Sequence, residues 1–398
     1  MKVIVSQYGA RRRYLIPQIL DARGVLCKLY TDSNVDSALG RFAKLLSRVF
    51  GNRQQLTKLI NRNPQISKSK IFSDDSLQIK ILSKKILKRP NKEIMDLIFE
   101  GSAKAFIREG VGDADWLYTM FIENIDFTKF AKKSGVKILA DIYENPYIFR
   151  ELVDELNHPE FECIRYTAHD HIVQAELREK YLDDLLRIAD KLLVPSNYVR
   201  SCLKRSQFYD ESKINVIPYV SSVANTTYAN KPIKGRIIWI GNDPVRKGLL
   251  YANKAIQQLQ SNGYNIDFRV TGPLPESLKT SPYFSNINFI GYLTKDQLRE
   301  EFNTADMFVF PTLAEGFAGV LLEAASFGVP IITTSASGFD EGFPGYIVPF
   351  RDVDSIAQAI EELLNNRNLR NTISKNTFKY AHSFSREAFA EKLLNLFD

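Results

Sequence analysis

Residues 310–330 of this 398-residue chain read FPTLAEGFAGVLLEAASFGVP, and their pattern decides the fold class. A short apolar run ends at Pro311, a loop carries Glu315, and a second apolar run stops at Gly328 with Pro330 beyond it. Glycine and then proline are the usual signals for the end of a helix, so the stretch predicts a buried strand, a loop and a helix. A strand that leads directly into a helix is the repeating unit of a parallel α/β sheet.

The same alternation extends through the whole chain. The apolar runs that predict buried strands are 2–6, 25–30, 116–120, 136–140 and 191–194 in the first half, and 236–240, 267–271, 288–290, 307–311, 330–334 and 346–348 in the second. We therefore expect an α/β fold with two Rossmann-like, doubly wound domains, which bind ligands at the carboxyl ends of their strands. The expected limits are 1–220 for the N-terminal domain, 221–384 for the C-terminal domain and 385–398 for a terminal helix that packs back on the first domain.

The composition is that of an ordinary globular protein, with 44% hydrophobic and 25% charged residues. No run approaches the roughly 20 apolar residues of a membrane-spanning helix, and the first residues predict a strand rather than a signal peptide. The cysteines at 27, 163 and 202 lie too far apart to suggest a disulfide framework or a zinc site. We expect a cytoplasmic protein, with peripheral attachment at the inner face of the cytoplasmic membrane as an open alternative.

The net charge of +7 is concentrated in one segment. Residues 41–92 hold fourteen Lys or Arg and two Asp, which gives this insertion a local charge of +12. A solvated face, an anionic membrane surface and an anionic acceptor all remain open as interpretations. Nucleic acid is not expected as a partner, because no nucleic-acid-binding motif accompanies the charge.

Three segments at predicted strand ends carry chemistry. Glu315 and Glu323 place two carboxylates around a helix start, where free amides can hold a phosphate or a sugar hydroxyl. Arg246 and Lys247, after the strand at 236–240, can neutralise a diphosphate without a metal. The loop after 288–290 can hold a base by stacking and backbone hydrogen bonds. Each segment alone has a plainer interpretation as a helix cap, a surface charge or a basic turn.

In combination, these motifs make the chain resemble glycosyltransferase family 4, the retaining enzymes of GT-B architecture also described as glycosyl transferases group 1. The segments that carry the resemblance are the Glu-x₇-Glu pair, Arg-Lys-Gly at 246–248, Gly-Tyr at 291–292, SGFDE at 337–341, GYIVP at 345–349, ADKLLVPS at 189–196 and VIP at 216–218. The resemblance covers about 185–398 in sequence and only topology before that.

The resemblance implies a role for each matching residue. The residues that it assigns to catalysis are Glu315, Lys247 and Arg246, and those that it assigns to the donor are Gly241, Arg246, Lys247, Gly291, Tyr292, Glu315, Gly316, Phe317, Ala318, Gly319 and Glu323. The N-terminal domain should bind the acceptor, with charge for a phosphate or an acidic sugar from 11–13. The candidate acceptor-binding residues are Gly9, Arg11, Arg12 and Glu144.

The chain departs from the family pattern at two places. The family usually has an arginine directly after the strand-end glycine, where this chain has Asn242, and Arg246 is the candidate to replace it. The family commonly has a histidine after a central strand of the N-terminal domain, where this chain has Asp141 and Glu144 as candidates. His169 and His171 come later, on a helical segment, and fit a helix-surface or interdomain position better than a catalytic one.

The resemblance implies retaining transfer of a hexose-type sugar from a nucleoside-diphosphate donor to an acceptor hydroxyl, in the synthesis of a cell-surface glycan or glycolipid. The expected partners are the nucleotide-sugar, a saccharide or lipid-linked acceptor and an anionic membrane surface. No metal or cofactor is expected, since none of the segments that carry the resemblance holds an Asp-x-Asp motif or a metal-ligand cluster. Two alternatives remain: a non-catalytic sugar-nucleotide or glycan-binding partner of a transferase, and a sugar-nucleotide epimerase of similar architecture.

Overall fold

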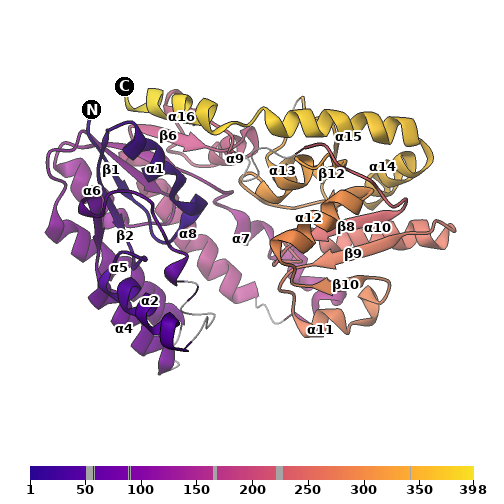
Figure 1. Ribbon diagram of the computed structural model, residues 1–398, viewed down its shortest axis with the longest axis horizontal. Helices are drawn as coiled ribbons and strands as arrows, with labels where there is room; N and C mark the ends of the chain where they lie inside the picture. The colour runs from indigo at the N-terminus through magenta and orange to yellow at the C-terminus, as the bar shows by residue number, and fades with distance from the viewer. Residues whose placement is uncertain are drawn as a thin grey trace.

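The computed structural model of the protein describes residues 1–50, 57, 59–87, 89, 91–164, 168–220, 227–340 and 342–398. Two parallel sheets lie side by side in Figure 1, one in each half of the chain, with helices packed around both. The sequence predicts a linker between the domains at about 221–234, and its residues 221–226 lie outside the described residues. Parts of the basic insertion, 51–56, 58, 88 and 90, also lie outside them, as does Glu341 of the SGFDE motif.

The first sheet has seven parallel strands in the order β3-β2-β1-β4-β5-β6-β7. Its strands are β1 Val3–Ser6, β2 Leu26–Thr31, β3 Ile71–Ser73, β4 Trp116–Met120, β5 Lys137–Asp141, β6 Lys191–Val194 and β7 Ile214–Val216. Alternate residues of the central strands pack into two different cores, so both faces of the sheet are buried. This explains why the central strands appear as continuous apolar runs. The sequence does not predict β3 and β7, which are short strands at the two edges.

The second sheet has six parallel strands in the order β10-β9-β8-β11-β12-β13. Its strands are β8 Arg236–Ile240, β9 Asp267–Thr271, β10 Asn288–Gly291, β11 Met307–Phe310, β12 Ile331–Thr334 and β13 Tyr346–Val348. All six match the predicted runs to within one residue. In each sheet the strand order reverses at the centre, between β1 and β4 and between β8 and β11. Ligands of such sheets bind at the carboxyl ends of the strands beside this reversal.

Helices cover the sheets and connect their strands. In the N-terminal half they are α1 Leu15–Ala22, α2 Ala38–Phe50, α4 Asp75–Ile86, α5 Asn91–Glu109, α6 Ile125–Lys133, α7 Ile148–Glu151, α8 Ala168–Ile188 and α9 Asn197–Leu203. In the C-terminal half they are α10 Leu249–Ser261, α11 Glu276–Lys279, α12 Lys295–Thr304, α13 Gly319–Ala325, α14 Val353–Asn365, α15 Arg367–His382 and α16 Arg386–Leu394.

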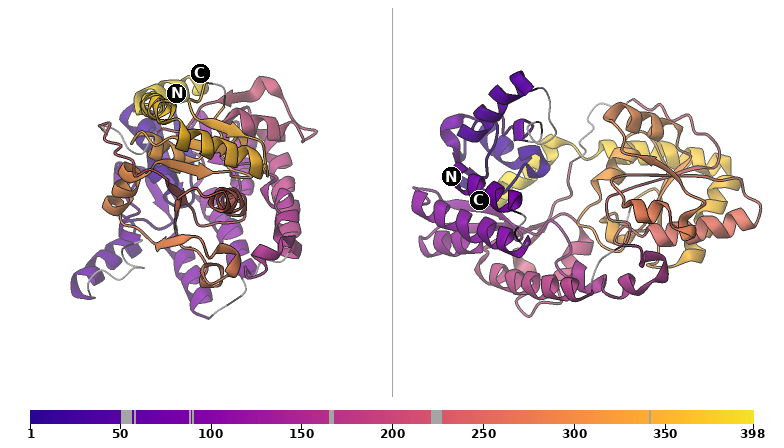
Figure 2. Two further views of the ribbon diagram at one scale, coloured as in Figure 1. Left: turned by 90° about the vertical axis from the view of Figure 1, so that its right-hand side faces the viewer. Right: turned by 90° about the horizontal axis from the view of Figure 1, so that it is seen from below.

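The chain returns to the N-terminal domain at its end, so the two termini lie together in Figures 1 and 2. Helix α15 packs on the C-terminal domain. Helix α16 places Phe389 and Leu393 in a core of the N-terminal domain, and the short turn after it adds Phe397. The ring of Phe397 lies edge-on to Trp116 of β4, with the ring centroids 5.7 Å apart. Burying these side chains on another domain fixes α15 and α16 on opposite sides of the junction.

A second segment, 148–164, crosses in the other direction. The sequence assigns it to the N-terminal domain from its position alone, but its apolar side chains join the core of the C-terminal domain. Phe161 stacks on Phe284 at 6.2 Å. Buried Glu155 accepts hydrogen bonds from the hydroxyl of Tyr251 at 2.7 Å and from Nε of Arg351 at 2.5 Å. The two domains therefore hold each other through exchanged segments as well as through the linker.

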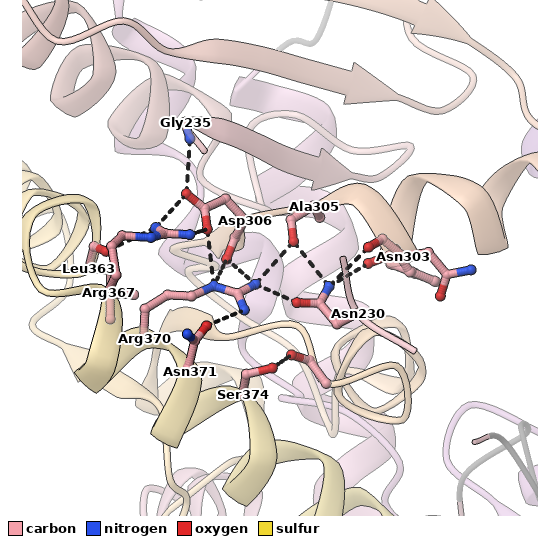
Figure 3. Close-up of polar contacts among 12 residues, drawn as sticks. Asn230, Gly235, Asn303, Ala305, Asp306, Leu363, Arg367, Arg370, Asn371 and Ser374 are labelled. Carbon is pink, nitrogen blue, oxygen red and sulfur yellow. Dashed lines mark hydrogen bonds and ion pairs between the residues drawn. The ribbon is translucent and has the colours of Figure 1, made fainter. Parts of the chain in front are cut away.

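A buried polar network fixes α15 to the amino end of β11 (Figure 3). Arg370 is completely buried, and its Nε lies 3.0 Å from Oδ1 of Asp306. The carboxylate of Asp306 also accepts from Arg367 at 2.7 Å and from the backbone N–H of Gly235 at 2.9 Å. Arg370 Nη2 donates to Asn230 Oδ1 at 2.6 Å, which ties the linker to the same point. Because this end of the sheet is opposite to the ligand-binding end, we assign the network a structural role.

We expect Arg370→Ala to destabilise the protein by about 3–5 kcal/mol, because it leaves the Asp306 carboxylate and several carbonyls buried without their main partner. Burial lowers the pKa of Arg370 to about 10, so the side chain is still charged at neutral pH. Arg367→Ala should cost less, since Arg367 is partly exposed. Chemical denaturation of both variants measures this, with Lys279→Ala as the control for an exposed ion pair. Equal effects for all three variants would contradict the assignment.

Candidate functional site

A cavity of about 560 Å³ opens at the carboxyl ends of the second sheet. Four of the residues predicted to bind a donor line it: Gly241 after β8, Lys247 before α10, Tyr292 after β10 and Glu323 on α13. The N-terminal domain contributes Arg13 to the same wall. These residues come from loops that are far apart in the sequence, and the parallel topology brings them to one place.

Two glycines make the wall of this cavity sterically permissible. A Cβ on Gly272, which has a φ of +137°, would lie 1.8 Å from the carbonyl oxygen of Gly241. A Cβ on Gly241 would lie 2.5 Å from Cδ of Lys247. The backbone turns after β8 and β9 therefore touch because residue 272 lacks a side chain, and the absence of a side chain at 241 leaves room for Lys247. Gly241 is among the residues predicted from the sequence, and Gly272 is not, although a Gly-Pro pair directly after a strand indicates a turn.

Arg246 does not line the cavity, because its guanidinium is held under the Glu315 loop. Its Nη1 lies 2.5 Å from Glu315 Oε1 and donates to the carbonyl oxygen of Ala314 at 2.9 Å, while its Nε donates to Asp243 at 3.1 Å. Burial opposes its charge, but Glu315 and Asp243 outweigh burial and raise the pKa of Arg246. The predicted contact between Arg246 and a diphosphate is not available in this arrangement. Its observed contacts give it a positioning role towards Glu315.

For Lys247, burial outweighs the effect of the neighbouring charges. Its Nζ lies 3.6 Å from Glu315 Oε1 and 5.0 Å from the centre of the Phe310 ring. Burial lowers the pKa of Lys247 below its ordinary value, because Glu315 compensates for only part of the lost hydration and Arg246 adds repulsion. An ammonium group that faces a cavity and whose neighbours replace only part of its lost hydration favours an anionic ligand.

The loop 316–318 forms the contact between the domains. A Cβ on Gly316 would lie 1.7 Å from the carbonyl oxygen of Tyr143, and Ser196 Oγ donates to the Gly316 carbonyl at 2.7 Å. The N–H of Ala318 donates to the carbonyl of Ser337 at 2.8 Å, so this amide, predicted to hold sugar or phosphate, is already satisfied. Phe317 is buried in the same contact. Gly319, at the start of α13, borders open space.

Of the two residues in the loop after β10 that are predicted to hold a base, one is used within the protein and the other faces the cavity. The carbonyl of Gly291 accepts from Thr271 Oγ1 at 2.6 Å and from the N–H of Gly272, so it is used within the sheet edge. Tyr292 has 83% of its surface exposed and lines the cavity. Of this pair, Tyr292 is the residue placed to contact a ligand.

The candidate acceptor residues lie after β1 and β5. Arg12 is directed into the domain, where its Nη2 lies 2.8 Å from the buried Asp141 and its guanidinium 3.7 Å from the centre of the Tyr219 ring. Glu144 pairs with Arg178 of α8 at 2.5 Å. Neither of the carboxylates considered as replacements for the family histidine is therefore without a cationic partner.

His171 does not line the cavity. His171 is buried edge-on against Phe149, with the ring centroids 5.2 Å apart, while the side chain of His169 lies outside the described residues. The loop after β1 is more open, since a Cβ on Gly9 would meet no atom within 4 Å.

Three buried carboxylates hold this loop, and of these the sequence predicts a functional role for Asp141 but not for Asp32 or Glu123. Asp32 after β2 accepts from the N–H of Gly9 at 3.0 Å, and Asp141 at the end of β5 pairs with Arg12. Glu123 after β4 is 2% exposed and accepts from the N–H of Tyr8 at 2.9 Å. The sequence signal that could have identified them is an acidic residue at the end of a buried strand. That these carboxylates hold the loop after β1 depends on contacts that only the fold creates.

Within the described ranges, no three His, Cys, Asp or Glu side chains are grouped so that they could hold a metal ion. None of the helices that the structure describes combines the length and the apolar character needed to cross a bilayer.

Comparison with known proteins places the cavity in a family context. Residues 234–366 match the family model described as glycosyl transferases group 1, which confirms the resemblance at this level. A relative is the Staphylococcus aureus capsular polysaccharide biosynthesis glycosyltransferase CapM, 32% identical over 170 residues, 40% of this chain and 45% of CapM. Another is a Campylobacter jejuni N,N'-diacetylbacillosaminyl-diphospho-undecaprenol alpha-1,3-N-acetylgalactosaminyltransferase, 24% identical over 238 residues, which are 58% of this chain and 60% of that protein. The chain thus matches less than two thirds of the length of either relative.

Similarity of structure extends further than similarity of sequence. The sucrose-phosphate synthase of Thermosynechococcus elongatus superposes with a TM-score of 0.63 over 100% of this chain and 98% of that chain, at 15% identity. At this identity the likeness shows the fold alone. The predicted fold class, two Rossmann-like domains in the GT-B arrangement, is confirmed.

We expect Glu123→Gln to remove a pH-dependent part of the stability. Burial raises the pKa of Glu123 to about 7, although Arg11 opposes this, and the ordinary value is 4.5. Between these values the native state holds more protons than the unfolded state. The contribution of Glu123 to stability is therefore full below about pH 4.5 and is lost as the pH rises to about 7. The free energy of unfolding of the wild type minus that of the variant should fall across this range, by at most on the order of 3 kcal/mol. A difference that does not change with pH would contradict the assignment.

Proposed function

We propose that the chain is a retaining glycosyltransferase that moves a hexose-type sugar from a nucleoside diphosphate to an acceptor hydroxyl, without a metal ion or cofactor. The observation that carries the proposal is the cavity at the carboxyl ends of the second sheet, which both Lys247 and Glu323 line within the region that matches the family model. Tyr292 adds an exposed ring for a base on the same wall.

Lys247 is the proposed electrostatic catalyst. Breaking the bond between sugar and diphosphate develops negative charge on the leaving phosphate, and a fixed cation at that point lowers the barrier. Lys247 is buried and incompletely compensated by Glu315 at 3.6 Å, so a bound diphosphate supplies the counter-charge that the ammonium lacks. This interaction strengthens as charge develops, which is the condition for catalysis rather than mere binding.

The two carboxylates have different proposed roles. Glu323 lines the cavity, and it can accept hydrogen bonds from the vicinal hydroxyls of a ribose. Glu315 is held by Arg246 at 2.5 Å beside the junction of the domains, where the transferred sugar would meet the acceptor. We therefore propose Glu315 as the residue that contacts the sugar and Arg246 as the residue that positions Glu315.

The acceptor is proposed to be a saccharide, lipid-linked in its natural form, and to bind the N-terminal domain. The names of two relatives support this assignment, since one refers to capsular polysaccharide and the other to a diphospho-undecaprenol acceptor. On the N-terminal side, the Tyr143–Glu144 turn meets the Gly316 loop that follows Glu315.

We expect Lys247→Ala and Glu323→Ala to lose most binding of the nucleoside diphosphate while their folded structure is retained. Glu315→Gln should keep nucleotide affinity within about threefold but lose most turnover, because its proposed contact is with the sugar. Calorimetric titration with UDP, GDP and ADP measures the first effect, and sugar release from the matching nucleotide-sugars measures the second.

Lys279→Ala is the matched control, because Lys279 is a surface lysine paired with Glu276 away from the cavity. Unchanged nucleotide affinity in both alanine variants would remove the donor site. If the protein binds a nucleotide-sugar but neither transfers nor slowly hydrolyses the sugar, a non-catalytic partner is favoured. If a stereocentre of the sugar is inverted while the sugar stays bound to the nucleotide, an epimerase is favoured.

We also propose that the basic insertion attaches the N-terminal domain to an anionic membrane surface. Helix α2 exposes Phe42 and Leu45, each 56% accessible, together with exposed Lys44 and Arg48. Apolar and cationic side chains exposed on one helix are typical of interfacial binding. Some cations of the insertion serve the fold instead, since Arg62 pairs with Asp32.

We expect the protein to co-sediment with vesicles that contain anionic lipid and not with neutral vesicles, at low salt. Each cation near an anionic surface contributes about 1 kcal/mol, so Lys44→Glu combined with Arg48→Glu should weaken attachment more than tenfold. Phe42→Ser combined with Leu45→Ser should weaken it by loss of apolar contact. Equal binding of wild type and both double variants, or no binding to either vesicle, would leave the insertion as solvated charge.

A further inference from the structure

Three consecutive arginines follow β1, and their side chains occupy three different environments. Arg11 Nε donates to the buried Glu123 at 2.8 Å, and its guanidinium lies over the ring of Tyr143. Arg12 is directed into the domain interior. Arg13 lines the cavity that is proposed to bind the donor. Among the residues that the structure describes, the ion pairs of this arginine run involve Arg11 and Arg12 and none involves Arg13.

The backbone of the loop is held in a conformation that residues with side chains rarely adopt. Arg12, Arg13 and Tyr14 have φ angles of +48°, +51° and +61°. Such left-handed residues are costly, so three in a row persist only where surrounding contacts enforce them. Here Tyr14 is fully buried, and the side chain of Gln7 donates to the carbonyls on either side of Ala10, those of Gly9 at 3.1 Å and Arg11 at 3.0 Å. Arg13 therefore extends from a fixed support.

The loop between β8 and α10 brings an ammonium group, but no guanidinium, to the wall of the cavity. Asn242 lines the cavity at the position directly after the strand-end glycine. Arg246 is committed to Glu315 and does not line the cavity. Lys295 and Arg299 do line it, but they lie on α12, the helix that follows the exposed Tyr292. The cation that this loop, 241–248, contributes to the cavity is therefore the ammonium of Lys247.

We propose that Arg13 binds the diphosphate of the donor from the N-terminal domain, opposite Lys247, and so makes donor binding depend on both domains. The inference rests on the proposed function and replaces the expectation that Arg13 serves the acceptor. A guanidinium offers two parallel N–H donors to a phosphate, which complement the single point charge of a lysine. The donor is favoured over an acceptor phosphate because Arg13 shares one cavity with the residues assigned to the nucleotide.

The test measures affinity for UDP, GDP and ADP, and for the corresponding nucleosides, in the absence of any acceptor. For whichever diphosphate binds the wild type, Arg13→Ala should weaken binding by about 10- to 100-fold, the usual size of a lost charge-assisted hydrogen bond. Affinity for the phosphate-free nucleoside should change by no more than about threefold. Arg13→Lys should restore part of the loss, because it keeps the charge but not the fork.

Arg13→Gly separates the side chain from the backbone. Glycine adopts a φ of +51° without strain, so this variant should be as stable to heat as the wild type and still lose diphosphate affinity as Arg13→Ala does. Diphosphate affinity equal to that of the wild type would overturn the inference and leave the proposed function standing. Equal losses for nucleoside and diphosphate would also overturn it, since they indicate a structural role. A wild type that binds none of the three diphosphates would overturn both proposals.

Discussion

The absence of a side chain at residue 316 is the constraint on which the arrangement of the two domains depends. A Cβ at that position would lie 1.7 Å from the carbonyl oxygen of Tyr143, so only glycine lets the backbones of the two domains touch. Around this point Ser196 donates to the Gly316 carbonyl, and Asn197 donates to Asp340 at 2.7 Å. Because Glu315 immediately precedes the contact, its carboxylate is fixed at the domain boundary. The same contact sets how closely the loop after β1 approaches the cavity of the second sheet.

Buried charge has a different function at each end of the sheets. At the amino end of β11, Asp306 and Arg370 satisfy each other and several backbone groups, so the charge contributes to fixing α15. At the carboxyl end of β8, Lys247 lies 3.6 Å from Glu315 and lines a cavity. Burying an ion is costly unless its partners replace water. A buried ion surrounded by hydrogen-bond partners therefore indicates a structural role, and an ion that faces a cavity with one distant partner indicates a ligand site.

The sequence is sufficient to predict the central strands and the site residues that directly follow them. Parallel strands buried on both faces appear as continuous apolar runs, and Gly241 and Lys247 reach the cavity because they lie within a few residues of a strand end. The edge strands β3 and β7 have three residues each, too few to show a pattern. The pairing of Arg246 with Glu315 and of the Ala318 amide with Ser337 could not be predicted, because both contacts depend on the conformation of loops. The packing of 148–164 on the other domain likewise depends on tertiary contacts.

Arg11, Arg12 and Arg13 show most directly what a sequence pattern leaves open. Three identical side chains in a row predict a cationic loop, and nothing in their order distinguishes them. In the structure, carboxylates at the ends of β4 and β5 engage the first two, and the left-handed backbone separates the third from them. Each of these buried carboxylates pairs with one arginine, and each arginine so used is withdrawn from the cavity. The number of cations available to an anionic ligand is therefore set by the acids at the strand ends and not by the number of arginines in the loop.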